Sequence, residues 1–259
     1  MERRTLPGGV TALVPGDLEE AGFVALFSER SGGVSTGAFE SLNLGLRCGD
    51  DPELAKQNRA RLCAAAGVAD FACGRQVHGT RIERIDRDRS GSGYLDPVDA
   101  MVATDGLLTD EQGVALAVLT ADCVPVVLAD PGSGRLVVVH AGWRGIAAGI
   151  VSEALRAFDR PTDVRAAIGP AIGPDHYEVG DDVALAVGAA CPSGAVTRSD
   201  GGRLLLDLPS SIAGILGDGG VDSISRTDSC TSCEEDRFFS YRRDGATGRQ
   251  GLVAVRVRS

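Results

Sequence analysis

Two short apolar runs joined by a turn constrain the fold of this chain more than any other feature. Val124–Leu128 and Leu136–Val139 flank the segment Asp130–Gly134, whose aspartate, proline and glycine residues are typical of turns. The pattern predicts two buried strands. If these strands are antiparallel neighbours, Cys123 and His140 at their outer ends reach the same rim of the sheet. A thiol and an imidazole at one rim are components of a metal site or a nucleophile site.

Length and composition favour one large globular domain. The chain has 259 residues, of which 43% are hydrophobic, and this is enough to bury a sizeable core. Since no linker, low-complexity tract or internal repeat divides it, we predict a single domain over residues 1–259. Strand patterns come in clusters with a few helices between them, which favours an α+β fold with mixed sheets over a regular βαβ winding.

Charge and targeting signals restrict the partners. A formal net charge of −10 disfavours nucleic acid or an anionic membrane as the partner, because phosphate groups would be repelled. The N-terminus lacks the apolar core of a signal peptide, and no apolar run approaches the length of a membrane span. Seven irregularly spaced cysteines fit a reducing compartment. We therefore predict a cytoplasmic protein, monomeric, that acts on a small molecule.

The rest of the chain alternates strand and helix patterns. A helix is expected to begin at Asp51–Glu53, because proline fits the first turn and acidic residues favour its positive end. Helical periodicity predicts one continuous helix over Gly145–Phe158. Further helices are predicted at Asp181–Ala190 and Pro209–Leu216, and further strands at Val10–Val14, Phe23–Phe27, Arg81–Ile85, Val114–Leu119, Val164–Ile168, Leu204–Leu206, Val221–Ser225 and Leu252–Val257.

The chain contains three histidines. His78 is predicted at the end of a short strand before a glycine, and His140 ends another strand before Ala-Gly. With Cys123 they supply two imidazoles and one thiolate, which suit Zn²⁺ and leave a fourth tetrahedral position open. His176 lies in a loop where no partner of comparable character is expected.

Two other interpretations use the same residues. In a Cys/His hydrolase, Cys123 would attack the substrate and a histidine would act as the base. Alternatively, Cys123 is a buried structural cysteine with two unrelated histidines. Imidazole also suits copper, but oxidases that couple several coppers need many more than three histidines, which weighs against a laccase.

The remaining cysteines and a glycine loop carry weaker signals. Cys230-x-x-Cys233 lacks two ligands of a structural zinc site, so we do not expect it to bind metal. The loop Ser28–Ser35 carries Arg30, and it can offer a guanidinium and backbone N–H groups to an anion. An ordinary surface loop is the alternative. The other cysteines are interpreted as small hydrophobic residues: Cys48, Cys63, Cys73 and Cys191.

Seven motifs together resemble the YfiH-type family, in order from about Phe23 to the C-terminus. Its members have been described as multicopper polyphenol oxidases or laccase-domain proteins, as peptidoglycan editing factor, and as zinc-dependent purine nucleoside phosphorylases with adenosine deaminase activity. The motifs are Phe27–Ser35, Ser41–Gly45, Gln76–Gly79, Thr120–Pro125, His140–Gly145, Gly169–Gly173 and Phe238–Gly245.

The resemblance implies an α+β domain with two mixed sheets between helices. It places the metal ligands on His78, Cys123 and His140, with one Zn²⁺ per chain and copper less favoured, and the catalytic groups on Cys123 and Arg242. Two departures from the family pattern are Glu29, where relatives more often carry a hydroxyl residue, and the additional Cys233. Substrate-binding residues would be Arg30, Asn43, Gln76 and Arg144, with Arg249 as a weaker candidate.

The implied substrates are purine nucleosides and inorganic phosphate. In phosphorolysis, phosphate lies beneath C1′ of the ribose while the glycosidic bond breaks with oxocarbenium character, and guanidinium groups position the phosphate. Tyr177 and Trp143 are candidates for stacking on the base. The alternative functions are a copper polyphenol oxidase and a Cys-dependent amidase that acts on cell-wall precursors.

Overall fold

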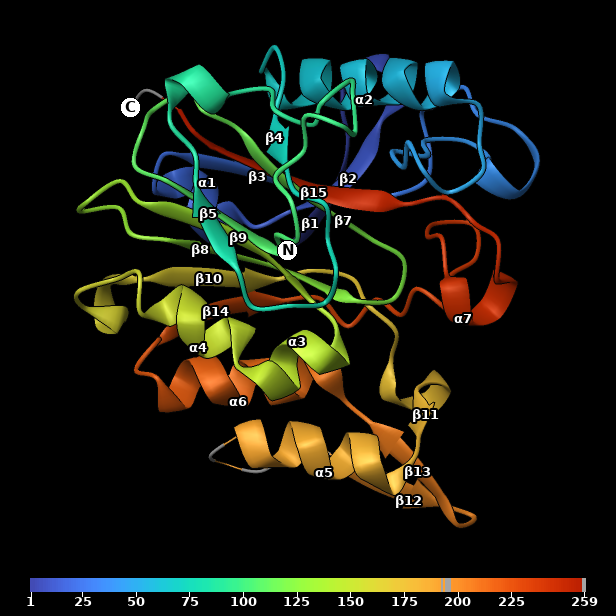
Figure 1. Cartoon of the computed structure of the whole chain (residues 1–259), viewed down its shortest axis with the longest axis vertical. Helices are drawn as coiled ribbons and strands as arrows, with labels where there is room; N and C mark the ends of the chain where they lie inside the picture. The colour runs from blue at the N-terminus through green and yellow to red at the C-terminus, as the bar shows by residue number, and fades with distance from the viewer. Residues whose placement is uncertain (192, 194–196, 258–259) are drawn as a thin grey trace.

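The computed structural model describes residues 1–191, 193 and 197–257, and it contains two six-stranded mixed sheets (Figure 1). In the first sheet, only β4 and β7 pair in parallel; in the second, β10 with β14 and β5 with β6 do. The predicted α+β class with two mixed sheets is therefore confirmed. The first sheet has the order β1 (Glu2–Thr5), β2 (Thr11–Val14), β3 (Phe23–Ser28), β15 (Gln250–Arg256), β7 (Leu116–Thr120), β4 (Ala72–Cys73); the second has the order β14 (Ser223–Arg226), β10 (Arg165–Ile168), β8 (Val124–Ala129), β9 (Leu136–Ala141), β6 (Gly106–Thr109), β5 (Ile82–Arg84).

The two sheets pack against each other, and helices cover their outer faces (Figure 1). Strand β8 is continuously apolar because both of its faces are buried. Val126 and Leu128 pack toward the helices, whereas Val127 and Ala129 pack between the sheets, and a strand buried on both faces has no polar side. Helix α2 (Pro52–Ala66) covers the first sheet, and α3 (Trp143–Ala148), α4 (Ile150–Leu155) and α6 (Leu208–Asp218) cover the second.

A smaller antiparallel sheet and α5 lie beyond α3, at the bottom of Figure 1. The smaller sheet has the order β11 (Glu178–Val179), β13 (Arg203–Leu206), β12 (Thr197–Asp200).

The other elements are one longer helix, two short α-helices and several 3-10 helices. They are α5 (Asp181–Ala190), α1 (Gly16–Glu20), α7 (Tyr241–Asp244), η1 (Pro7–Gly9), η2 (Gly37–Phe39), η3 (Arg87–Arg89), η4 (Pro161–Asp163) and η5 (Pro174–His176). Among the described residues, no helix has both the length and the apolar character that a membrane span requires.

The structure corrects two predictions about secondary structure. The single helix predicted over Gly145–Phe158 is wrong, because Gly149 adopts a φ of 94° and separates α3 from α4. Only glycine reaches this left-handed conformation at little cost, so periodicity alone could not show the break. His78 does not end a strand, because β4 stops at Cys73 and a loop carries the chain onward.

A buried carboxylate at the end of β3 binds both strand β1 and the segment before α7. Glu29, directly after β3, has a fully buried side chain. It accepts hydrogen bonds from Nη2 of Arg3 at 2.8 Å and from Nε of Arg237 at 2.8 Å. Burial opposes ionisation of Glu29, but the two guanidinium groups outweigh it and lower the pKa of its carboxyl. Glu29, one of the two departures from the family pattern, therefore forms ion pairs with Arg3 and Arg237.

We predict that Glu29→Gln lowers the free energy of unfolding by roughly 2–4 kcal/mol at neutral pH, because it leaves two guanidinium groups around a neutral amide. A carboxyl with a lowered pKa stabilises the fold above its unfolded value of about 4.3, and it loses this contribution as pH falls through the folded pKa. The difference between variant and wild type should therefore shrink below about pH 4. Denaturant titrations at several pH values measure it.

The matched control is Glu153→Gln, which removes an exposed ion pair with Arg156. It should change stability by less than about 1 kcal/mol. The role of the Glu29 ion pairs would be contradicted if Glu29→Gln lowered the free energy of unfolding as little as Glu153→Gln does. It would also be contradicted if the loss of stability in Glu29→Gln stayed unchanged in acid.

Candidate metal centre

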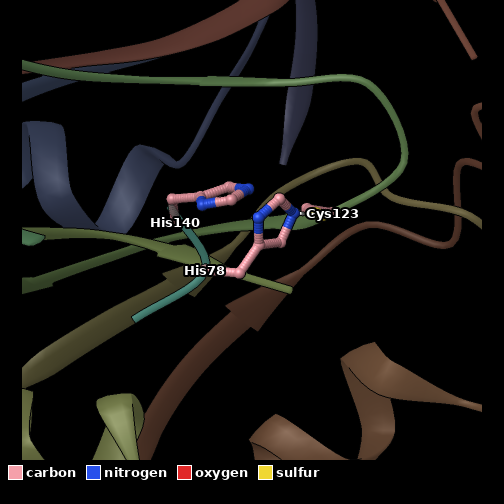
Figure 2. A group of neighbouring side chains, drawn as sticks. All are labelled: His78, Cys123 and His140. Atoms are coloured by element: carbon pink, nitrogen blue, oxygen red, sulfur yellow. Dashed lines mark hydrogen bonds between the residues drawn. The ribbon is translucent and has the colours of Figure 1, made fainter. Parts of the chain in front are cut away.

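Three separate segments bring together the predicted ligands His78, Cys123 and His140 (Figure 2). Strands β8 and β9 are antiparallel, with Val124 opposite Ala141, so Cys123 and His140 meet at one rim as the turn pattern predicted. The loop after β4 supplies His78. Its Nε2 lies 3.6 Å from Sγ of Cys123, and the two imidazole rings are 4.8 Å apart at 70°. All three ligand atoms lie within 4.8 Å of one another.

Asp105, which the sequence analysis missed, orients two of these ligands. Its carboxylate accepts backbone hydrogen bonds from Val77, His78 and Gly79 at 2.8–3.1 Å. It also lies 2.8 Å from Nδ1 of His140. Burial opposes its ionisation, but His140 and the N–H groups lower the pKa of Asp105. With Nδ1 bonded to Asp105, Nε2 of His140 is available to a metal, the usual carboxylate–histidine arrangement of metal sites.

No local sequence signal distinguishes Asp105 from the other aspartates of the chain. It stands just before β6, and Gly106 pairs with Val139 in β9. This pairing of distant strands places the carboxylate beside His140. Only the sheet topology therefore identifies Asp105 as part of the centre.

The backbone is strained at two positions of the centre. His78 has a φ of 62° and Asp122, directly before Cys123, has a φ of 88°. Each such non-glycine residue costs about 1–3 kcal/mol unless its surroundings hold it in place. Asp105 holds His78, and the buried Asp122 accepts hydrogen bonds from Thr231 Oγ1 at 2.6 Å and from the backbone of Arg242 at 2.7 Å. The structure thus maintains this strain with specific hydrogen bonds.

The electrostatics favour a thiolate at Cys123. Burial alone would raise the pKa of this thiol, but His140 and His78 lower it to about 6. Burial would lower the pKa of His140, whereas Cys123 and Asp105 raise it to about 9. A thiolate is the form that binds a divalent cation, and an incoming metal displaces the proton on the imidazole. Two imidazoles and a thiolate in this arrangement fit Zn²⁺ and leave one position open.

The side chain of Arg242, predicted to be catalytic, lies near the centre. Its guanidinium lies 5.0 Å from the ring centroid of Tyr177 and donates to the carbonyl of Glu178 at 3.1 Å. Burial raises the pKa of Tyr177 to about 12, and the charge of Cys123 adds to this shift. Arg242 and Arg144 act in the opposite direction. Tyr177 therefore lies within electrostatic range of Cys123 and of both arginines.

Arg30, a predicted substrate-binding residue, lies elsewhere. Its guanidinium stacks on Phe239 and donates to the carbonyls of Glu40 and Glu235. Together with Arg243 it lines a cavity of about 610 Å³ whose other charged residues are acidic. This cavity does not include the His/Cys/His group. The acidic residues of its wall are Glu40, Glu235, Asp236 and Asp244.

Asn43 and Gln76, also predicted to bind substrate, are bonded within the protein. Asn43 is fully buried, and its amide oxygen accepts from the backbone of Gly45 and Arg249 at 2.9 and 2.8 Å. Both ends of the Gln76 amide pair with the backbone of Leu119 in β7. These contacts are structural. Substrate contact at either residue stays a prediction that would require exchange of internal hydrogen bonds.

The fold and the centre together define a class of α+β proteins with a candidate His/Cys/His metal site at the rim of a mixed sheet. This chain belongs to the family described as multi-copper polyphenol oxidoreductase laccase, whose sequence profile matches residues 24–256. It is similar to purine nucleoside phosphorylase YlmD of Geobacillus stearothermophilus, with 40% identity covering 88% of each chain.

Other relatives extend the likeness. Purine nucleoside phosphorylase YfiH of Escherichia coli is 37% identical over 92% of this chain and 95% of its own. The crystal structure of Bacillus licheniformis hypothetical protein YfiH superimposes with a TM-score of 0.89 at 31% identity, covering 99% of both chains. The crystal structure of YlmD gives a TM-score of 0.87 at 39% identity, covering 92% of this chain and 93% of that chain.

Gly142 has no side chain, and this leaves room for the side chains of His78 and Cys123. A Cβ atom at this position would lie 2.5 Å from Cδ2 of His78 and 3.0 Å from Sγ of Cys123. We therefore predict that Gly142→Ala displaces His78 and weakens zinc binding by about tenfold or more. Competition titration with a zinc chelator measures the affinity.

Gly214→Ala in α6 is the control, since a Cβ there meets nothing within 4 Å. It should bind zinc as the wild type does. Equal zinc affinity in the Gly142 and Gly214 variants would show that the ion does not bind between His78 and Cys123.

Proposed function

We propose that this protein is a zinc-dependent purine nucleoside phosphorylase that also deaminates adenosine. The observation that carries the proposal is the grouping of His78, Cys123 and His140 beside Arg242 and Tyr177. Relatives at 37–42% identity, over 85–92% of this chain, are named purine nucleoside phosphorylases. The substrates would be a purine nucleoside and inorganic phosphate, and the products a purine base and ribose 1-phosphate.

Arg242 and Arg144 are the best candidates to hold phosphate. Among the described residues, the guanidinium of Arg242 donates one hydrogen bond, to the carbonyl of Glu178, so other N–H groups of this guanidinium remain for an anion. Arg144 is exposed and stacks on Trp143 at 4.4 Å. Guanidinium groups bind phosphate oxygens in a bidentate manner, and they offset the negative charge of the phosphate that approaches C1′. Arg30 is a weaker candidate for anion binding, because acidic groups surround it and its guanidinium already donates to two carbonyls.

The three ligands would hold Zn²⁺, with Asp105 fixing the His140 ring and the loop of His78. A bound zinc ion lowers the pKa of water toward about 7, which is the chemistry that deamination needs. Tyr177 remains a neutral phenol at physiological pH because its pKa is raised to about 12. It can therefore donate a hydrogen bond to a substrate oxygen or nitrogen without becoming charged.

A Cys-dependent hydrolase is the second candidate, and one observation favours it. The sequence of contacts from Cys123 to His140 to Asp105 pairs a nucleophile with a base and an orienting acid, as cysteine hydrolases do. A copper oxidase is less favoured. The described residues offer only two His/Cys groups, too few for a coupled copper cluster.

We predict that inosine cleavage requires phosphate, saturates with it and yields ribose 1-phosphate. Phosphate is the nucleophile in phosphorolysis, whereas a hydrolase would release free ribose and ignore phosphate. Deamination of adenosine should persist without phosphate because it uses water. Chromatography of the purine products, with an enzymatic assay for ribose 1-phosphate, measures both reactions.

The ligand variants His78→Ala, Cys123→Ala and His140→Ala should abolish both activities together. If chelation ends deamination but leaves phosphorolysis intact, the shared-zinc proposal is wrong. Phosphate-independent release of ribose, blocked by alkylation of Cys123, would instead support the hydrolase.

We further predict that Arg242→Lys lowers kcat/KM for phosphorolysis by about 100-fold or more, because a compact ammonium cannot reproduce the bidentate fork. Zinc content should not change, since Arg242 is not a ligand. Arg156→Lys, at an exposed position after α4, is the control and should retain full activity. Full turnover by Arg242→Lys would move the phosphate role to Arg144 or Arg30.

A further inference from the structure

A second group of metal-ligating side chains lies outside the centre described above. A ring nitrogen of His176 and the Sγ atoms of Cys230 and Cys233 lie within 4.8 Å of one another. The distance from Sγ of Cys233 to Nδ1 of His176 is 3.5 Å. The expectation that His176 has no comparable partner is therefore wrong, and Cys230-x-x-Cys233 has gained the third ligand that its sequence neighbourhood lacks.

Two segments that are distant in the sequence build this group. His176 ends η5, which follows the rigid loop Gly169–Gly173, and the cysteines occupy the turn after β14. The backbone N–H of Gly173 donates to Sγ of Cys230 at 3.2 Å. A Cβ on Gly173 would lie 3.1 Å from this sulfur, so glycine lets the two segments approach.

We propose that His176, Cys230 and Cys233 form a second zinc site, separate from the His78 site. Two thiolates and one imidazole are a ligand set that Zn²⁺ prefers, and an exogenous ligand such as water would take the fourth position. Cys230 is buried and anchors the site, while His176 and Cys233 are exposed and leave it open to the ion from solvent.

Proton balance is part of the proposal. A thiol must lose its proton before its sulfur can bind a divalent cation. Binding of Zn²⁺ forms two Zn–S bonds and releases the thiol protons to solvent. Affinity should therefore increase with pH.

The second zinc would act as a clamp beside the first site. Thr231, between the two cysteines, donates its backbone N–H to Ala171 at 2.9 Å and its hydroxyl to Asp122 at 2.6 Å. Tyr177 directly follows His176. An ion that joins η5 to the cysteine turn would thus fix Tyr177 relative to the segment that bears Asp122 and Cys123.

The test measures zinc alone, in the full-length chain reduced, stripped of metal and dialysed against Zn²⁺. Elemental analysis should find about two zinc ions per wild-type chain and about one in Cys233→Ser, in His176→Gln and in His78→Ala. The combination of Cys233→Ser with His78→Ala should bind none. Ser232→Ala, which changes the same turn but keeps both thiols, is the matched control and should bind two.

Substitution with Co²⁺ gives an independent readout. The two sites contain three thiolates in total, one at Cys123 and two here. Loss of the second site in Cys233→Ser should therefore reduce the thiolate-to-cobalt absorption to about one third. Circular dichroism of this exposed-residue variant checks that it folds.

The proposal is overturned if Cys233→Ser binds as much zinc as wild type, or if His78→Ala removes all of it. It is also overturned if the reduced protein rejects a second ion and intact mass shows that Cys230 and Cys233 form a disulfide on exposure to air. None of these measurements uses nucleoside turnover. Failure of the second site is therefore distinguishable from failure of the proposed phosphorylase activity.

Discussion

The carboxylate of Asp105 is the interaction on which the candidate centre depends. One buried group holds the loop of His78 through three consecutive N–H groups and the ring of His140 through Nδ1. Without it, His78 would stand at the end of a loop with a φ of 62° and no strand to support it. The loop geometry and the imidazole orientation are thus set by the same charge. A metal ion would then meet ligands that are already in place, and little ordering entropy would oppose binding.

The β8 and β9 pair supplies the rigid part of the centre, and its position could be predicted from the sequence. Continuous apolar runs around a strong turn signal define two buried neighbours, and their antiparallel pairing leaves little freedom for Cys123 and His140. The α+β class and α5 followed from equally local signals. The break at Gly149 did not, since a glycine is tolerated inside a helical pattern, and only packing of α3 and α4 shows that the chain turns there.

Contacts between distant segments were the part that sequence reasoning could not supply. Asp105 reaches His140 through the pairing of β6 with β9, and His176 reaches Cys233 across 57 positions. Asn43 and Gln76 show the converse: their hydrogen bonds within the protein could not be inferred from the motifs that contain them. A polar residue in a family motif suggests a ligand contact, yet both amides here bond to backbone groups of the protein. A motif identifies which residues matter, and the hydrogen-bond partners show whether they support the fold or remain available to a substrate.

The same reasoning separates the arginines. Arg243 donates to the carbonyls of Thr231, Ser232 and Phe238 and pairs with Asp244, so it stabilises the turn that carries Cys230 and Cys233. Its neighbour Arg242 uses its backbone N–H to hold Asp122, while its guanidinium lies over Tyr177. These two adjacent residues of α7 thus have different roles. Arg243 fixes the segment, and Arg242 presents a positive charge beside Tyr177. Because Asp122 bonds both Arg242 and Thr231, a shift in the cysteine turn would reach Cys123 through a single side chain, and this connects the order of the second site with the geometry of the first.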